Sequence, residues 1–132
     1  MKPRHKNSLN IENDKKDSAF IANKQSQEIY MKLGDSAKIG KNLAQMAIIQ
    51  SELGDFIGSD NTAIQALKYL DKENLEYRAS VYNCIAISAK KRKDYKEAIY
   101  WYKKAIEIDN NYCIYICIYI YLYIYIYVMI LL

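Results

Sequence analysis

The sequence predicts an all-α protein, an antiparallel array of helix-turn-helix units followed by an apolar tail. Two observations carry this prediction. Residues 79–111 place apolar side chains at the 3.6-residue period of a helix, with one polar interruption, and a weaker copy of this pattern precedes them. Residues 112–132 hold no charged side chain and mostly alternate Ile with Tyr. The chain therefore divides into a lead-in at 1–18, helical repeats at 19–111 and the tail.

The lead-in is polar and charged, and Leu9 and Ile11 are its only sizeable aliphatic side chains. Because so few apolar groups bury too little surface to offset chain entropy, we expect residues 1–18 to be disordered. No apolar segment follows the basic start, so the sequence predicts no signal peptide. Without secretion, the three cysteines are not expected to form a disulfide framework, and a reducing, cytoplasmic setting is predicted.

A close pair of helices is predicted within residues 79–111. Its two apolar faces consist of Tyr82, Ile85, Ala86 and Ala89, and of Ala98, Tyr102, Ala105 and Ile106. The polar run Lys90–Lys93 ends the first helix, and Asp94 with Glu97 three residues later resembles a capping box. Small Ala86 and Ala98 at the crossing, with Tyr102 beside them, indicate tight antiparallel packing.

This pattern resembles the tetratricopeptide signature, whose helix-turn-helix unit is about 34 residues long. The residues that carry the resemblance are Tyr82, Ile85, Ala86, Ala89, Ala98, Tyr102 and Ala105. Two positions depart from the family, because Ala89 stands where Tyr is usual and Asn110 where Pro is usual. The resemblance implies a module that holds another protein.

The same pattern recurs upstream. Leu43, Met46 and Ala47 match Tyr82, Ile85 and Ala86, and the turn Gly54-Asp55-Phe56 matches Lys93-Asp94-Tyr95. We expect the second-helix positions to be Ala63, Leu67 and Leu70, with four additional residues in a turn at 57–61. A further helix at 19–33 ends at Gly34-Asp35, which gives about five helices over 19–109. Since stable arrays need about three repeats, the chain resembles part of a longer array.

Three interpretations of the tail remain open. Its length fits a transmembrane helix, although its seven tyrosines would place hydroxyls throughout the hydrocarbon. The Ile/Tyr alternation fits a strand, since both residue types favour strands. A repeated TA dinucleotide also encodes Tyr and Ile alternately in every reading frame, so the tail could be a translated low-complexity run.

The sequence predicts no enzyme, no cofactor and no metal site. The only histidine, His5, lies in the lead-in, so His-dependent triads and metal sites are not expected. Cys84 is expected to be a small packed residue, and the tail offers Cys113 and Cys117 no further ligands. The four glycines are expected at caps and turns, not in a phosphate-binding loop.

Tetratricopeptide arrays bind partners on the concave face that first helices line. The resemblance places on that face Ser80, Asn83, Ile87, Lys90 and Lys91. Asn83 would hydrogen-bond an extended backbone, and Lys90 would meet an acidic side chain or a terminal carboxylate. The basic run Lys90–Lys93 is open to two interpretations, a solvated turn or an import or anion-binding patch. The set of side chains that clamps chaperone tails is not found.

The predicted function is a scaffold or sensor module for protein–protein interaction, with another protein or peptide as partner. Nucleic acid is not an expected partner, because the net charge of +4 is mild and dispersed. The irregular repeat lengths resemble the repeat regions of bacterial signalling proteins, of which this chain would be a fragment. The alternative is a membrane-tethered adaptor that residues 112–132 anchor.

Overall fold

The computed structural model describes residues 3–108 and 114–132, with side chains described over 11–108 and 120–132. In these residues it has six helices and no strand. They are α1 Pro3–Leu33, α2 Ser36–Glu52, α3 Phe56–Tyr69, α4 Leu75–Lys91, α5 Tyr95–Ile108 and α6 Ile114–Leu131. The predicted all-α class is therefore confirmed.

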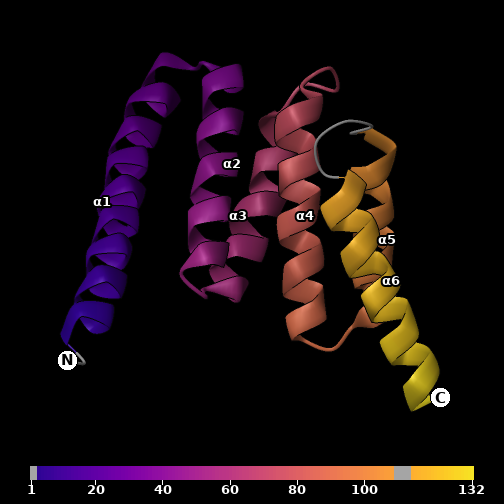
Figure 1. Cartoon of the computed structure of the whole chain (residues 1–132). Helices are drawn as coiled ribbons and strands as arrows, with labels where there is room; N and C mark the ends of the chain where they lie inside the picture. Colours follow the sequence, from indigo (N-terminus) through magenta and orange to yellow (C-terminus); the bar gives the residue numbers. More distant parts are fainter. Residues whose placement is uncertain (1–2, 109–113) are drawn as a thin grey trace.

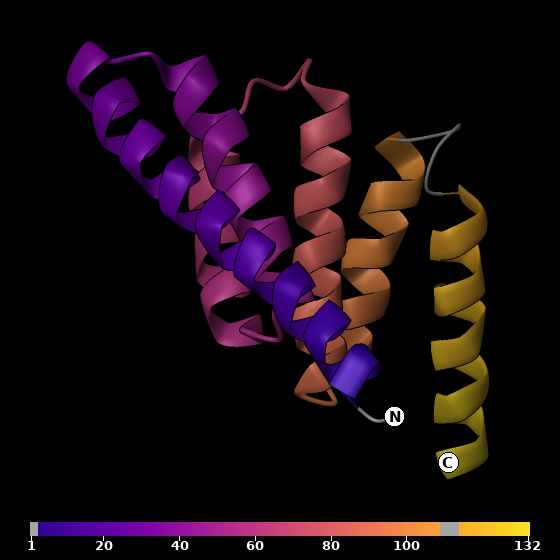
Figure 2. The same ribbon diagram turned by 60° about the vertical axis from the view of Figure 1, so that its left-hand side comes forward.

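The helices form an array in which each packs against the next along the chain, and α2 also packs against α4. Figure 1 shows α2 and α4 in one layer with α3 behind them, α1 at one end of the row and α6 at the other. In the turned view of Figure 2, α1 crosses in front of the array and α6 stands at its right-hand edge. The first helices of successive hairpins are therefore neighbours.

Three turns share one local geometry. A left-handed residue precedes an aspartate at Gly34-Asp35, Gly54-Asp55 and Lys93-Asp94, with φ of 66°, 86° and 64°. The aspartate carboxylates accept from Lys38 N at 3.2 Å, Gly58 N at 2.9 Å and Glu97 N at 3.2 Å. Each aspartate thus caps the following helix by satisfying one of its unpaired N–H groups, as the sequence predicted.

Only one of the two hydrogen bonds of the capping box expected at Asp94 is observed. Asp94 accepts from the Glu97 N–H, but its own N–H donates to the Ala89 carbonyl at 2.9 Å. The Glu97 carboxylate instead pairs with Arg92 at 3.0 Å.

The expected turn at 57–61 is wrong, because these residues belong to α3. Ser, Asp and Asn are favoured in loops, but they also suit the first turns of a capped helix, where Asp55 begins this one. The register of the second helix shifts accordingly. The counterparts of Ala98, Tyr102 and Ala105 are Ser59, Ala63 and Ala66, all fully buried, and not Ala63, Leu67 and Leu70. The additional residues lie between α3 and α4.

Two glycines are also placed differently from the expectation. Gly40 lies inside α2 and Gly58 inside α3, whereas Gly34 and Gly54 occupy turns. A side chain on Gly40 would meet the backbone of Tyr69 and Leu70 at 3.0 Å, so glycine allows α2 to approach the end of α3.

The disordered lead-in expected at 1–18 is not observed over residues 3–18, which belong to α1. The prediction considered only burial, and the helix is supported by other means. Pro3 stands at the first helical position, where proline is favoured, and no glycine follows it within α1. Lys16 pairs with Glu12 one turn earlier, at 3.1 Å, and with Glu52 of α2 at 3.8 Å.

A strand in the tail is likewise wrong, since α6 covers Ile114–Leu131. In the described part of the tail every residue is apolar or Tyr, so a helix presents apolar groups on each face, including the one that meets α4 and α5. Ile124 is 1% exposed and packs with Ala86, Ala89, Ala98 and Tyr102, flanked by Ile120 and Val128 one turn away on either side. Among the described residues, none of the helices combines the length and apolar character needed to cross a bilayer. The origin of the tail in a dinucleotide repeat stays a prediction.

Candidate functional site

A hollow of about 250 Å³ lies between the first helices of the two hairpins, α2 and α4. It is lined by Ile48, Ser51, Glu52, Ser80, Asn83, Cys84 and Ile87. We call it the first-helix groove. On each helix the lining residues are three or four positions apart, which places them on one face. The groove therefore exists because α2 and α4 pack side by side.

The walls combine two isoleucines with small polar groups. The Ser80 hydroxyl donates to the Glu76 carbonyl at 3.1 Å, which leaves the serine oxygen able to accept. Glu52 places a carboxylate at one side, and Lys16 of α1 lies 3.8 Å from it. Asn83 carries an amide, which both donates and accepts. Such a surface suits an extended chain, whose backbone alternates donors and acceptors and whose side chains need apolar contact.

The structure divides the five residues predicted for partner binding into two groups. Ser80, Asn83 and Ile87 lie together in the first-helix groove, whereas Lys90 and Lys91 line a second hollow at the end of α4. The first group lies beside α2, whereas Lys90 and Lys91 lie at the end of α4, where α5 begins and α6 packs.

Sequence reasoning missed the wall that α2 supplies, namely Ile48, Ser51 and Glu52. A signal was available. The correspondence of Leu43 with Tyr82 also aligns Ile48 with Ile87, and it aligns Ser51 and Glu52 with Lys90 and Lys91. Applying the family-like positions to both first helices would have found these three residues.

Cys84 lies at the bottom of the groove and is 4% exposed. Burial raises the pKa of its thiol to about 11, against a smaller opposing effect of a hydrogen bond with Ser59. The thiol is therefore protonated at neutral pH and lacks the thiolate that nucleophilic chemistry needs. Within the described residues, no three His, Cys, Asp or Glu side chains gather as metal ligands would.

Comparison with protein families identifies the second hairpin. The family model of the tetratricopeptide repeat matches residues 79–112. Residues 79–112 are therefore a tetratricopeptide repeat. The hairpin of α2 and α3 has the same helix lengths as that of α4 and α5, 17 and 14 residues, and so repeats the unit. No curated protein and no solved structure matches the chain.

Tetratricopeptide repeats are typically non-enzymatic modules that hold other proteins. In general terms, the chain is accordingly a scaffold for protein–protein interaction.

Proposed function

We propose that the chain binds an extended segment of another protein in the first-helix groove, as a scaffold module. The observation that carries the proposal is the joint lining of one hollow by two first helices, with Ser80, Asn83 and Ile87 facing Ile48 and Ser51. The groove offers hydrogen-bonding groups for a backbone and aliphatic contact for a side chain, which together favour an extended peptide.

The chemistry of the lining residues restricts which peptide sequences the groove favours. Ile48 and Ile87 favour an aliphatic or aromatic side chain at the centre of the bound segment. Glu52 disfavours an acidic residue beside it, because like charges repel. We therefore expect segments with a central apolar residue and a neutral or basic neighbour.

The role as a sensor, membership in a longer bacterial signalling protein and the cytoplasmic setting remain predictions from the sequence, as does the division at residues 18 and 111. The membrane-tethered adaptor rests on the tail alone, and none of the described helices is long and apolar enough to cross a membrane.

Peptide selection on the full-length chain tests the proposal. Random peptides would be displayed on phage, selected on the immobilised chain and then measured by fluorescence anisotropy against Ser51→Arg and Ser80→Arg. Each substitution fills the groove from a different wall with a long side chain. We expect both to abolish binding of the selected peptides.

Gln65→Arg is the matched control, because Gln65 is exposed on α3, away from the groove. Thermal unfolding of all three variants separates a blocked groove from a lost fold. Peptides that bind Ser51→Arg and Ser80→Arg as tightly as the parent would refute the groove as the binding site. Failure to select any specific peptide would refute the proposed function itself.

A further inference from the structure

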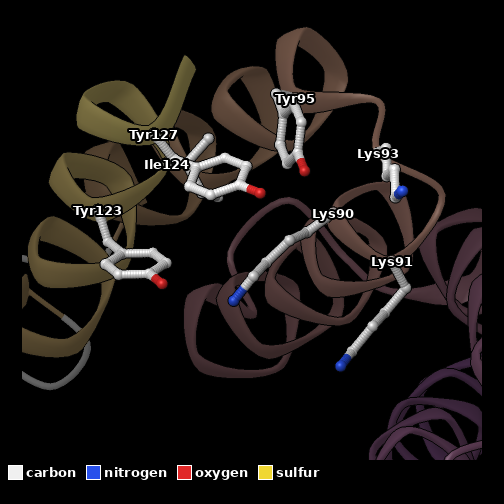
Figure 3. A pocket seen from close by; sticks show the side chains of 7 residues that line it. All are labelled: Lys90, Lys91, Lys93, Tyr95, Tyr123, Ile124 and Tyr127. Carbon is white, nitrogen blue, oxygen red and sulfur yellow. The ribbon is translucent and has the colours of Figure 1, made fainter. Parts of the chain in front are cut away.

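A second hollow, of about 270 Å³, opens where the end of α4, the start of α5 and α6 meet. We call it the lysine–tyrosine pocket. It is lined by Lys90, Lys91, Lys93, Tyr95, Tyr123, Ile124 and Tyr127 (Figure 3). None of these residues lines the first-helix groove, so the pocket is a separate feature of the array.

The pocket carries an excess of positive charge. Among the ion pairs of the described residues, none includes Lys90, Lys91 or Lys93. The cation between them in sequence, Arg92, is engaged elsewhere, with Asp60 at 3.5 Å and Glu97 at 3.0 Å. The nearby carboxylate of Asp94 caps α5. The side chains of all three lysines line the pocket. Among the described ion pairs no carboxylate neutralises them, and the Lys91 ammonium lies 5.1 Å from the centre of the Phe56 ring.

Tyrosines supply the other wall. The Lys90 ammonium lies 5.9 Å from the centre of the Tyr123 ring, and the rings of Tyr95 and Tyr127 meet edge to face with centroids 5.9 Å apart. Figure 3 shows the hydroxyls of Tyr95 and Tyr127 directed toward the space in front of Lys90. Phenol hydroxyls donate hydrogen bonds to anionic oxygens, while the rings and buried Ile124 offer apolar contact.

The backbone of Lys93 provides an independent observation. Lys93 has a φ of 64°, the left-handed conformation that disfavours residues with a Cβ. The two equivalent turns have glycine there, Gly34 and Gly54. Because the same chain has glycine at the two equivalent positions, the strained Lys93 indicates that its side chain provides a function that offsets the cost of the conformation. Backbone strain of this kind is frequent at functional sites. Lys93 is one of the three lysines that line the pocket.

We propose that the lysine–tyrosine pocket binds a phosphate monoester carried on an apolar or aromatic group. A dianionic phosphate matches several ammonium groups better than a single carboxylate does, and its oxygens accept from the tyrosine hydroxyls. The rings of Tyr123 and Tyr127 would contact the body of the ester. The ester could belong to a small molecule or to a phosphorylated side chain, since the recognised chemistry is the same.

An alternative role for Lys90 and Lys91 is to offset the negative end of the α4 dipole. That role affects stability only. It also leaves Lys93 unexplained, because Lys93 lies beyond the helix and its conformation opposes folding.

Calorimetric titration of the full-length chain with phenyl phosphate, at low ionic strength, tests the proposal. We expect saturable binding that weakens as salt is added, with inorganic phosphate weaker and phenol undetectable. Lys93→Gly and Lys90→Gln should each weaken binding about two- to fivefold, the range for exposed charge pairs. Lys96→Gln is the control, because Lys96 is an exposed lysine of α5 that does not line the pocket, and its affinity should equal that of the parent.

Lys93→Gly keeps the test independent of folding, since it relieves strain and should not lower the melting temperature. Absence of phenyl phosphate binding to the parent would overturn the proposal, as would equal binding by Lys93→Gly, Lys90→Gln and Lys96→Gln. A peptide with a phosphotyrosine is the second arm. If this peptide binds more tightly than phenyl phosphate, the natural ligand is a phosphorylated protein. If the two bind equally, the natural ligand is a small ester. Both outcomes support phosphate binding in the pocket.

Discussion

The two hairpins have the same helix lengths and the same turn, but their helices meet through different side chains. In the hairpin of α4 and α5, Ala86 meets Ala98, with Tyr102 filling the space beside them. In the hairpin of α2 and α3, the counterpart of Ala98 is Ser59, whose hydroxyl donates to the Ala47 carbonyl at 2.7 Å. Small residues at the crossing are therefore common to both, whereas the large aromatic is not.

The comparison explains why the family model matches only one hairpin. A family model weighs side-chain identity, and Ala63 replaces Tyr102 in the first hairpin. The neighbours compensate for the smaller residue, because Ala63 belongs to the same core cluster as Val81 and Ile85 of the following helix, α4. The helix that follows the second hairpin in the described chain is α6, and it contributes Ile124 to the cluster around Tyr102.

Tyr102→Ala would give the second hairpin the residue of the first, and we expect the largest loss. Tyr102 is fully buried, so the truncation leaves a cavity that should cost about 3–5 kcal/mol of unfolding free energy. Urea unfolding followed by circular dichroism measures it. Tyr100→Ala, at a side chain 52% exposed, is the control with a much smaller loss. A small loss at Tyr102 would show that Ala suffices at this position in both hairpins.

Ile124→Ala tests whether α6 completes the second hairpin as α4 completes the first. Removing a buried isoleucine should lower the unfolding free energy by about 2–5 kcal/mol. The matched variant is Ile126→Ala, because Ile126 lies on the same helix and is 56% exposed. Equal, small effects of both changes in the same urea titration would mean that α6 does not pack on the array.

Ala98→Leu should destabilise by about 1–3 kcal/mol, because the crossing with Ala86 has no room for a larger side chain. Ala98→Ser imports the residue of the first hairpin, where Ser59 finds an acceptor in the preceding helix. We expect it to cost less than the leucine. Thermal melts of the two variants compare them directly, and a leucine variant that melts no lower than the parent would disprove the assigned crossing.

The smallest effect concerns the turns. Lys93→Gly should raise the unfolding free energy by about 1 kcal/mol, and Gly54→Lys should lower it by a similar amount. A Cβ on Gly54 would meet nothing within 4 Å, so the cost there is conformational and not steric. Urea unfolding measures both. If Lys93→Gly destabilises the chain, the side chain of Lys93 contributes more to folding than its backbone conformation costs.

Much of the fold follows from local sequence. The all-α class, the antiparallel hairpins, the aspartate caps at Asp35, Asp55 and Asp94 and the repeat at 79–112 were predictable. Each depends on residues within one or two turns of one another, through capping hydrogen bonds and a repeated apolar spacing. The groove was predictable in part, since Ser80, Asn83 and Ile87 follow from a single helix.

The tertiary structure decided the rest, because those features depend on which surfaces meet. The helical state of residues 57–61 depends on the Asp55 cap and also on the burial of Ser59 against Ala47, and local loop propensity does not reveal that burial. The alternation of Ile and Tyr in the tail favours a strand. The tail is nevertheless a helix, and this helix buries Ile124 against α4 and α5. The lysine–tyrosine pocket brings together two helix ends and the tail. Its chemistry belongs to no single segment of the sequence, because only packing places Lys93 and Tyr127 around one hollow.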